Sequence, residues 1–129
     1  MSLLKRVLIV DDEDQTRRSV DRAIKRFWPE VETAQAGDGI QAVHVAEKFL
    51  PELMVLDLML PGQDGFAVLD SFCKNSKLKS TLILGITGYN TPKNRAAFTK
   101  GIRTFLQFLS PTSFNKSLLD SASRDLPSI

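Results

Sequence analysis

The sequence predicts an α/β fold in which a doubly wound, five-stranded parallel sheet carries five helices on its two faces. Two observations support this prediction. Short apolar runs rich in Val, Ile and Leu alternate along the chain with longer segments whose apolar residues recur at helical spacing. Several of the apolar runs are nearly continuous, which is typical of strands buried on both faces of a parallel sheet.

The first half of the chain alternates strand and helix twice. Residues 5–10 form a β-branched run that ends in acidic residues and predicts the first strand. Residues 13–27 follow with apolar side chains at helical spacing, and Pro29 ends that pattern. A weaker strand is expected at residues 31–35, and a second helix over residues 38–49. Four apolar residues form the expected buried face of this second helix: Ile40, Ala42, Val43 and Ala46.

Asp38 is expected to cap the second helix and Asp64 the third, because a carboxylate at that position accepts a backbone N–H of the first turn. The run at residues 53–57 is the most apolar strand candidate in the chain. A Pro-Gly turn separates it from the third helix, expected over residues 64–73.

The last third of the chain continues the alternation. A fourth strand is expected at residues 81–86, and a short helix opens at residues 91–92 with proline in its first turn. A fifth strand is expected at residues 104–109, and a final helix runs from residue 111 to about residue 122.

Length, composition and charge exclude several classes of protein. The chain has 129 residues, 43% hydrophobic and 25% charged, which fits one globular domain. One cysteine and one histidine exclude a disulfide framework and His- or Cys-rich metal sites. No apolar run approaches the roughly 20 residues that span a bilayer, and the N-terminus lacks a signal-peptide pattern. We therefore expect a cytoplasmic protein.

The charge is small and uneven. Residues 1–92 hold 11 Lys/Arg against 13 Asp/Glu, a net charge of −2, whereas residues 93–129 hold 6 against 2, a net charge of +4. Because the basic residues are not clustered, a solvated surface is expected rather than direct binding of nucleic acid or a membrane.

Acidic side chains follow two of the predicted strands. Asp11 and Asp12 come directly after the first strand, Asp57 ends the third, and Thr87 follows the fourth. Ligands of such sheets bind beyond the carboxyl ends of the strands, near the switch in strand order, where Asp11, Asp12 and Asp57 should converge. Carboxylates that lie so close together repel one another unless a cation neutralises them. Mg²⁺ is a cation that prefers such oxygen ligands. The alternative is that these acids are solvated helix caps.

Two glycine-containing segments suggest a nucleotide site instead. Residues 37–42 match G-x-G-x-x-A, but they follow the weakest strand rather than the first, and a single half-size sheet lacks the second half that holds a dinucleotide. A flavin loop at residues 87–91 would similarly follow the fourth strand instead of the first.

Five segments in order resemble the receiver domain of two-component response regulators over essentially the whole chain. They are VLIVDDE at 7–13, AGDGIQAV at 36–43, LMVLDLMLPGQDGFAVL at 53–69, ILGITGY at 83–89 and KGIRTFL at 100–106. The resemblance implies a flavodoxin-like, three-layer α/β/α receiver domain over residues 1–123, with a tail at 124–129 and no output domain.

The resemblance also implies roles for individual residues. Asp57 is then the phosphoacceptor, and Asp11 and Asp12 hold Mg²⁺ together with Asp57 and the backbone carbonyl of Met59. Thr87 and Phe105 stand at the hydroxyl and aromatic switch positions. The implied donor is a sensor histidine kinase or a phosphotransfer protein, and the implied docking face for a downstream protein is helix 4, strand 5 and helix 5. Such a domain assists its own phosphorylation and is not a multiple-turnover enzyme.

One departure from the family pattern concerns the lysine that usually ends strand five. An ungapped alignment puts Phe108 at the lysine position, and a one-residue deletion puts Gln107 there. Loss of this cation weakens charge neutralisation of the phosphoryl group. Two hypotheses follow: a phosphoacceptor with slowed or altered signalling, or a degenerate receiver that docks partners independently of phosphorylation.

Overall fold

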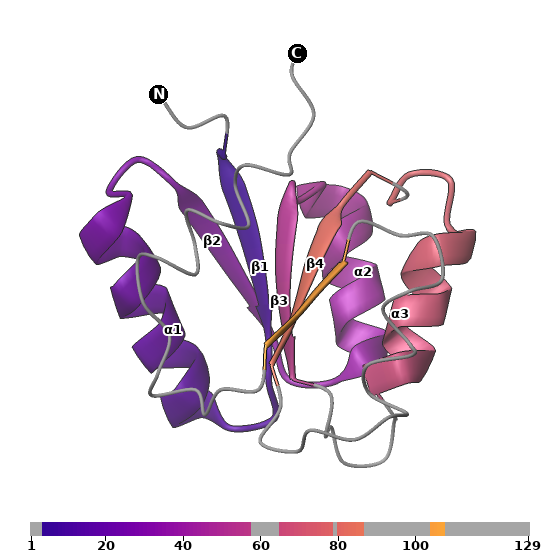
Figure 1. Ribbon diagram of the computed structural model, residues 1–129, viewed down its shortest axis with the longest axis horizontal. Coiled ribbons are helices and arrows are strands. Elements are labelled where there is room, and N and C mark those ends of the chain that lie inside the picture. Colours follow the sequence, from indigo (N-terminus) through magenta and orange to yellow (C-terminus); the bar gives the residue numbers. More distant parts are fainter. Residues whose placement is uncertain (1–3, 58–64, 79, 87–103, 108–129) are drawn as a thin grey trace.

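The structure is a computed structural model that describes residues 4–57, 65–78, 80–86 and 104–107. Within these residues the chain alternates strand and helix in the expected order (Figure 1). The elements are β1 (Arg6–Val10), α1 (Asp14–Phe27), β2 (Glu32–Ala36), α2 (Gly39–Phe49), β3 (Leu53–Asp57), α3 (Gly65–Lys74), β4 (Leu82–Ile86) and β5 (Thr104–Gln107).

The five strands form one parallel sheet with the order β2-β1-β3-β4-β5. The order reverses between β1 and β3, because the chain moves outward to β2 and then returns past β1. In the register, Val10 pairs with Leu56, and Asp57 pairs with Ile86. The residues that follow β1 and those that end β3 therefore meet at the carboxyl edge of the sheet.

The sheet lies between two helical layers, with α1 on one face and α2 and α3 on the other (Figure 1). Alternate residues of each strand point to opposite faces, so the core has two parts. On the α1 face, Val20 and Ile24 pack with inward residues of three strands: Val7, Ile9, Leu53, Val55, Leu82 and Leu84. On the other face, Ala42, Ala46, Val68 and Phe72 pack with Leu8, Val10, Met54, Leu56 and Ile83.

The alternation of β3 decides where Asp57 points. Val55 belongs to the core on the α1 face, and Asp57 lies two residues further along the same strand. The same spacing relates Ile9 to Asp11 at the end of β1. Both carboxylates therefore emerge on the face that α1 covers.

The sequence located each described element to within one or two residues, with one error in the orientation of a helix. Asp38 caps α2 as expected, because its Oδ1 accepts the backbone N–H of Gln41 at 2.8 Å. Ile40, however, was expected on the buried face and is 77% exposed. The buried stripe of α2 contains Gly39, Ala42 and Ala46, and Ile40 lies about 100° around the helix from Gly39.

The helices expected after β4 and after β5, the Asp64 cap, and residues 108–109 of the expected fifth strand lie outside the described residues. Among the helices that the structure does describe, none has both the length and the apolar character needed to cross a bilayer.

Candidate functional site

Three carboxylates meet at the carboxyl edge of the sheet where the strand order reverses. Each of Asp11, Asp12 and Asp57 offers an oxygen, and these three oxygens lie within 4.8 Å of one another. Asp11 is buried, Asp57 is half-buried and Asp12 is exposed. The structure thus brings together the side chains of two neighbouring residues and of Asp57, which lies 46 positions after Asp11, as the strand ends predicted.

Asp11 is the most constrained member of this acidic cluster. Its backbone N–H donates to the Ala36 carbonyl at 3.1 Å, and its Oδ1 accepts the Glu13 N–H at 2.8 Å. Burial of the carboxyl, with a further contribution from the charges of Asp57, Asp12 and Glu13, raises the pKa of Asp11 from 3.8 to about 7, although the Glu13 N–H opposes the rise. The ionised form of Asp11 is therefore unfavourable in the absence of a cation.

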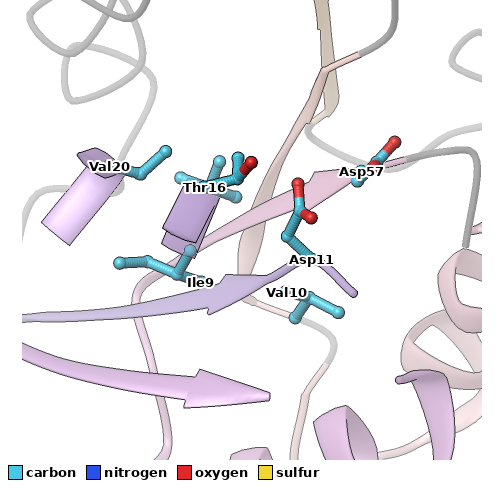
Figure 2. Close-up of a pocket in the computed structure, with 7 residues that line it drawn as sticks. Ile9, Val10, Asp11, Thr16, Val20 and Asp57 are labelled. Atoms are coloured by element: carbon cyan, nitrogen blue, oxygen red, sulfur yellow. The ribbon is translucent and has the colours of Figure 1, made fainter. Parts of the chain in front are cut away.

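A small pocket separates the acidic cluster from the core beneath α1. It has a volume of about 10 Å³ and is lined by Asp11, Asp57, Thr16 and four apolar residues: Ile9, Val10, Val20 and Val55. Figure 2 shows Asp11 and Asp57 at adjacent strand ends, with Thr16 and Val20 on the neighbouring helix. A space of this size holds about one water molecule, so it has no room for a larger ligand.

Arg17 and Thr16 are two residues of the site that the sequence analysis missed. The Arg17 Nη1 donates to the backbone carbonyl of Asp11 at 2.6 Å, and Thr16 lines the pocket. A signal for Thr16 was present, because it stands four residues before Val20 and so shares the stripe of α1 that faces the sheet. No comparable periodicity marks Arg17, whose contact depends on the path of its side chain.

The donor set of the acidic cluster fits a divalent cation. Mg²⁺ prefers oxygen ligands at about 2.1 Å, so two ligands on opposite sides of the ion lie about 4.2 Å apart. Neighbouring ligands of an octahedral ion lie closer, about 3.0 Å apart, and the three oxygens, all within 4.8 Å of one another, are gathered on this scale. Mg²⁺ usually keeps several waters and binds one or two carboxylates directly. A site with three aspartates can therefore hold the ion partly through water.

Several expected site residues lie outside the described part of the chain: Met59, Thr87 and Phe108. Phe105 and Gln107 lie in β5, where their backbones pair with Leu84 and Ile86 respectively. Because Ile86 also pairs with Asp57, one row across the sheet joins Asp57 to Gln107. Gln107 is one of the two residues aligned with the family's strand-five lysine. Its backbone therefore lies at the same edge as the acidic cluster.

The glycine-rich segment at residues 37–42 has a local structural use. It follows β2, an outer strand of the sheet, rather than a strand at the reversal of strand order. The Gly37 N–H donates to Gln41 Oε1 at 2.6 Å, and the Gln41 N–H donates to Asp38. A phosphate would need free N–H donors here, but these two N–H groups already donate to side chains at the start of α2.

Comparison with known proteins gives this arrangement a family. The family model of the response regulator receiver domain matches residues 7–107. Response regulator PleD of Caulobacter vibrioides is 40% identical over 63 residues, which cover 49% of this chain and 13% of that protein. Transcriptional activator protein PfeR of Pseudomonas aeruginosa is 29% identical over 117 residues, which cover 90% of this chain and 35% of that protein. The chain therefore spans about a third or less of these curated relatives.

A solved structure extends the likeness to the whole fold. The chemotaxis protein CheY4 of Vibrio cholerae superimposes with a TM-score of 0.79 at 25% identity, covering 95% of this chain and 99% of that one. The reversal of strand order, the carboxylates gathered there and the matched family model agree with one another. The chain belongs to the response regulator receiver domain family.

Proposed function

We propose that this chain is a phosphoacceptor domain that receives a phosphoryl group on Asp57 from the phosphohistidine of a sensor kinase or a phosphotransfer protein. Receiver domains are signalling domains of two-component systems and interact with such donors. The observation that carries the proposal is the position of Asp57, half-buried at the end of β3 and grouped with two other carboxylates. We place the domain in the cytoplasm.

The proposed reaction is a substitution at phosphorus. A carboxylate oxygen of Asp57 attacks the phosphorus atom of the phosphohistidine, and a P–O bond forms as the P–N bond breaks. The bonding electron pair leaves with the imidazole nitrogen of the donor, and Asp57 becomes an acyl phosphate. The apolar side chains of Val20 and Val55 support this role, because they line the small pocket beside Asp57 and leave space there for about one water molecule.

Asp11 and Asp12, with Asp57, are the residues that would hold Mg²⁺, and Met59 is proposed to add its backbone carbonyl. Bound there, the ion would supply charge neutralisation between the carboxylates and the incoming phosphoryl group. The raised pKa of Asp11 supports this assignment, because a carboxylate whose ionised form is disfavoured by burial and by neighbouring carboxylates is stabilised by a bound cation. Thr87 and Phe105 are proposed as the residues through which the phosphoryl group changes the docking face formed by helix 4, strand 5 and helix 5.

The missing lysine supports a second candidate function. β5 has the sequence TFLQ, and its carboxyl end lies in the same row as Asp57. A receiver without a cation there would neutralise the phosphoryl charge less effectively. The second candidate is therefore a domain that docks partner proteins independently of phosphorylation.

Incubation with acetyl phosphate and Mg²⁺, followed by intact-mass measurement, separates the two candidates. A phosphoacceptor gains one phosphoryl group, and it loses this gain in Asp57→Asn or when EDTA removes the cation. Asp38→Asn is the matched control, because Asp38 lies at the same edge of the sheet and asparagine caps a helix equally well. An unmodified wild-type chain, or an adduct that survives Asp57→Asn, would refute the phosphoacceptor and leave docking.

A further inference from the structure

The guanidinium of Arg17 joins three segments that surround the acidic cluster. Its Nη1 donates to the Asp11 carbonyl at 2.6 Å, its Nε donates to Gln35 Oε1 at 3.1 Å, and its Nη2 lies 3.1 Å from Asp14 Oδ1. The Arg17 side chain is 16% exposed. One planar group therefore connects the end of β1, the strand β2 and the first turn of α1.

The hydrogen bond from Arg17 to the Asp11 carbonyl, directly after β1, bears on the acidic cluster. The Asp11 carbonyl belongs to the peptide group that joins Asp11 to Asp12, and so its orientation affects the direction of both side chains. Two further hydrogen bonds hold the backbone on either side: the Asp11 N–H donates to Ala36, and the Glu13 N–H donates to the Asp11 carboxylate. Arg17 holds the first of the two carbonyls between them, that of Asp11.

We propose that Arg17 is a positioning residue for the metal site, acting through the Asp11–Asp12 peptide group and not through its charge. The inference rests on the proposed function, since it assumes that the acidic cluster holds a divalent cation. The direction in which loss of Arg17 changes metal affinity separates a positioning role from an effect of its charge. A positive charge beside the site repels a cation, so loss of the charge alone would strengthen metal binding. Loss of the positioning contact would weaken it.

A titration with Mn²⁺, monitored through the electron paramagnetic resonance signal of the free ion, measures whether metal affinity rises or falls. We expect Arg17→Met to bind Mn²⁺ at least fivefold more weakly than the wild type. Arg17→Lys should also bind more weakly, because one ammonium group cannot reach three acceptors on three segments. Arg17→Met binding that equals or exceeds that of the wild type would overturn the proposal.

Arg18→Met is the matched control. Arg18 also pairs with Asp14, at 3.0 Å, but its side chain is 65% exposed and no contact joins it to Asp11 among the described residues. Its loss removes the same charge from the same helix, and we expect Mn²⁺ affinity within twofold of the wild type. An equal loss of affinity in both variants would show that position does not matter and would contradict the proposal.

A metal-free measurement tests the positioning contact by itself. The Glu13 amide donates to Asp11 Oδ1, so its hydrogen exchange should become at least fivefold faster in Arg17→Met and stay unchanged in Arg18→Met. If Arg17→Met fails to fold, Gln35→Met removes only the Nε acceptor and should produce the same change with smaller size. A wild type that binds no Mn²⁺ would refute the proposed metal site, whereas unchanged Glu13 exchange in Arg17→Met would refute the role of Arg17.

Discussion

The two edges of the sheet use carboxylates in opposite ways. At the amino edge, Glu52 Oε1 accepts the backbone N–H groups of Lys5 at 2.8 Å and Arg6 at 2.6 Å, which ties β1 to the start of β3. At the carboxyl edge, Asp11 and Asp57 belong to a cluster of three carboxylates, in which the pKa of Asp11 is raised. One edge gains stability from its acid, and the other loses stability that a bound cation would restore.

Polar groups are paired at the amino edge, whereas like charges gather at the carboxyl edge. The amino edge also carries a buried hydrogen bond from the Thr81 hydroxyl to the Pro51 carbonyl at 2.9 Å. Both the Glu52 carboxylate and the Thr81 hydroxyl thus have partners within the protein. The carboxyl edge gathers like charges at the reversal of strand order, which is the place where such sheets bind ligands. Removal of the Glu52 carboxylate and removal of a carboxylate from the acidic cluster should therefore change stability with opposite signs.

The largest effect is expected at the amino edge. Glu52→Ala should lower the free energy of unfolding by about 3 kcal/mol, because two backbone N–H groups lose a charged acceptor and one of them is partly buried. Urea denaturation followed by the fluorescence of Trp28, which packs against the core, measures the change. Glu52→Gln keeps an acceptor oxygen and should lose about half as much. An unchanged midpoint in Glu52→Ala would mean that this edge is not tied by Glu52.

The opposite sign is expected for Asp11→Asn in metal-free protein. The pKa of Asp11 is about 7 in the fold against 3.8 in the unfolded chain. As the pH rises from 4 to 7, the unfolded chain releases its proton first, and the fold loses stability. Asparagine removes this loss, so Asp11→Asn should be more stable than the wild type by about 2 kcal/mol at pH 8 in EDTA.

Urea denaturation at pH 8 and at pH 5 tests both the sign and the cause. The advantage of Asp11→Asn should shrink at pH 5, where Asp11 of the folded wild type is mostly protonated. Destabilisation by Asp11→Asn at pH 8, or an advantage of the same size at both pH values, would contradict an Asp11 carboxylate whose ionised form is disfavoured by burial and by its acidic neighbours.

Metal binding should show the same titration. A protonated Asp11 is not a ligand, so a divalent cation must displace its proton at pH values below about 7. We expect Mn²⁺ affinity to fall about tenfold between pH 8 and pH 6, by calorimetric titration. Asp38→Asn, which changes a carboxylate outside the acidic cluster, should keep this dependence. Equal affinity at the two pH values would place the ion away from Asp11.

The smallest effect concerns a carboxylate of the carboxyl edge that has a structural use. Asp38 accepts the Gln41 N–H at 2.8 Å and caps α2. Asp38→Ala should lower the free energy of unfolding by about 1 kcal/mol, and Asp38→Asn should leave it nearly unchanged. Thermal unfolding of the two variants provides the measurement. Stabilisation by Asp38→Ala would mean that repulsion extends beyond the three clustered aspartates.

Sequence patterns predicted the sheet because the apolar runs are strong local signals. They also predicted that Asp11 and Asp57 would meet, since parallel strands end at one edge and the order of strands follows from the connections. The error at Ile40 has a local cause. Its apolar character suggested burial, but the small residues Gly39, Ala42 and Ala46 form the stripe that approaches the sheet.

The contacts that sequence reasoning missed join segments far apart in the chain. Glu52 reaches the backbone of Lys5, 47 positions away, and Arg17 reaches both Asp11 and Gln35. Neither contact follows from helical or strand periodicity, because each depends on how a long polar side chain crosses between elements. The raised pKa of Asp11 likewise depends on burial, which only the assembled structure supplies.

We expect the carboxylates of the carboxyl edge to form a divalent-cation site beside Asp57, the proposed phosphoacceptor. A crystal of the wild-type chain grown with Mn²⁺ and examined by anomalous diffraction would locate the ion. An anomalous peak is expected among the carboxylates of Asp11, Asp12 and Asp57, absent from crystals grown with EDTA. A peak elsewhere on the chain, with none at these three carboxylates, would contradict this expectation.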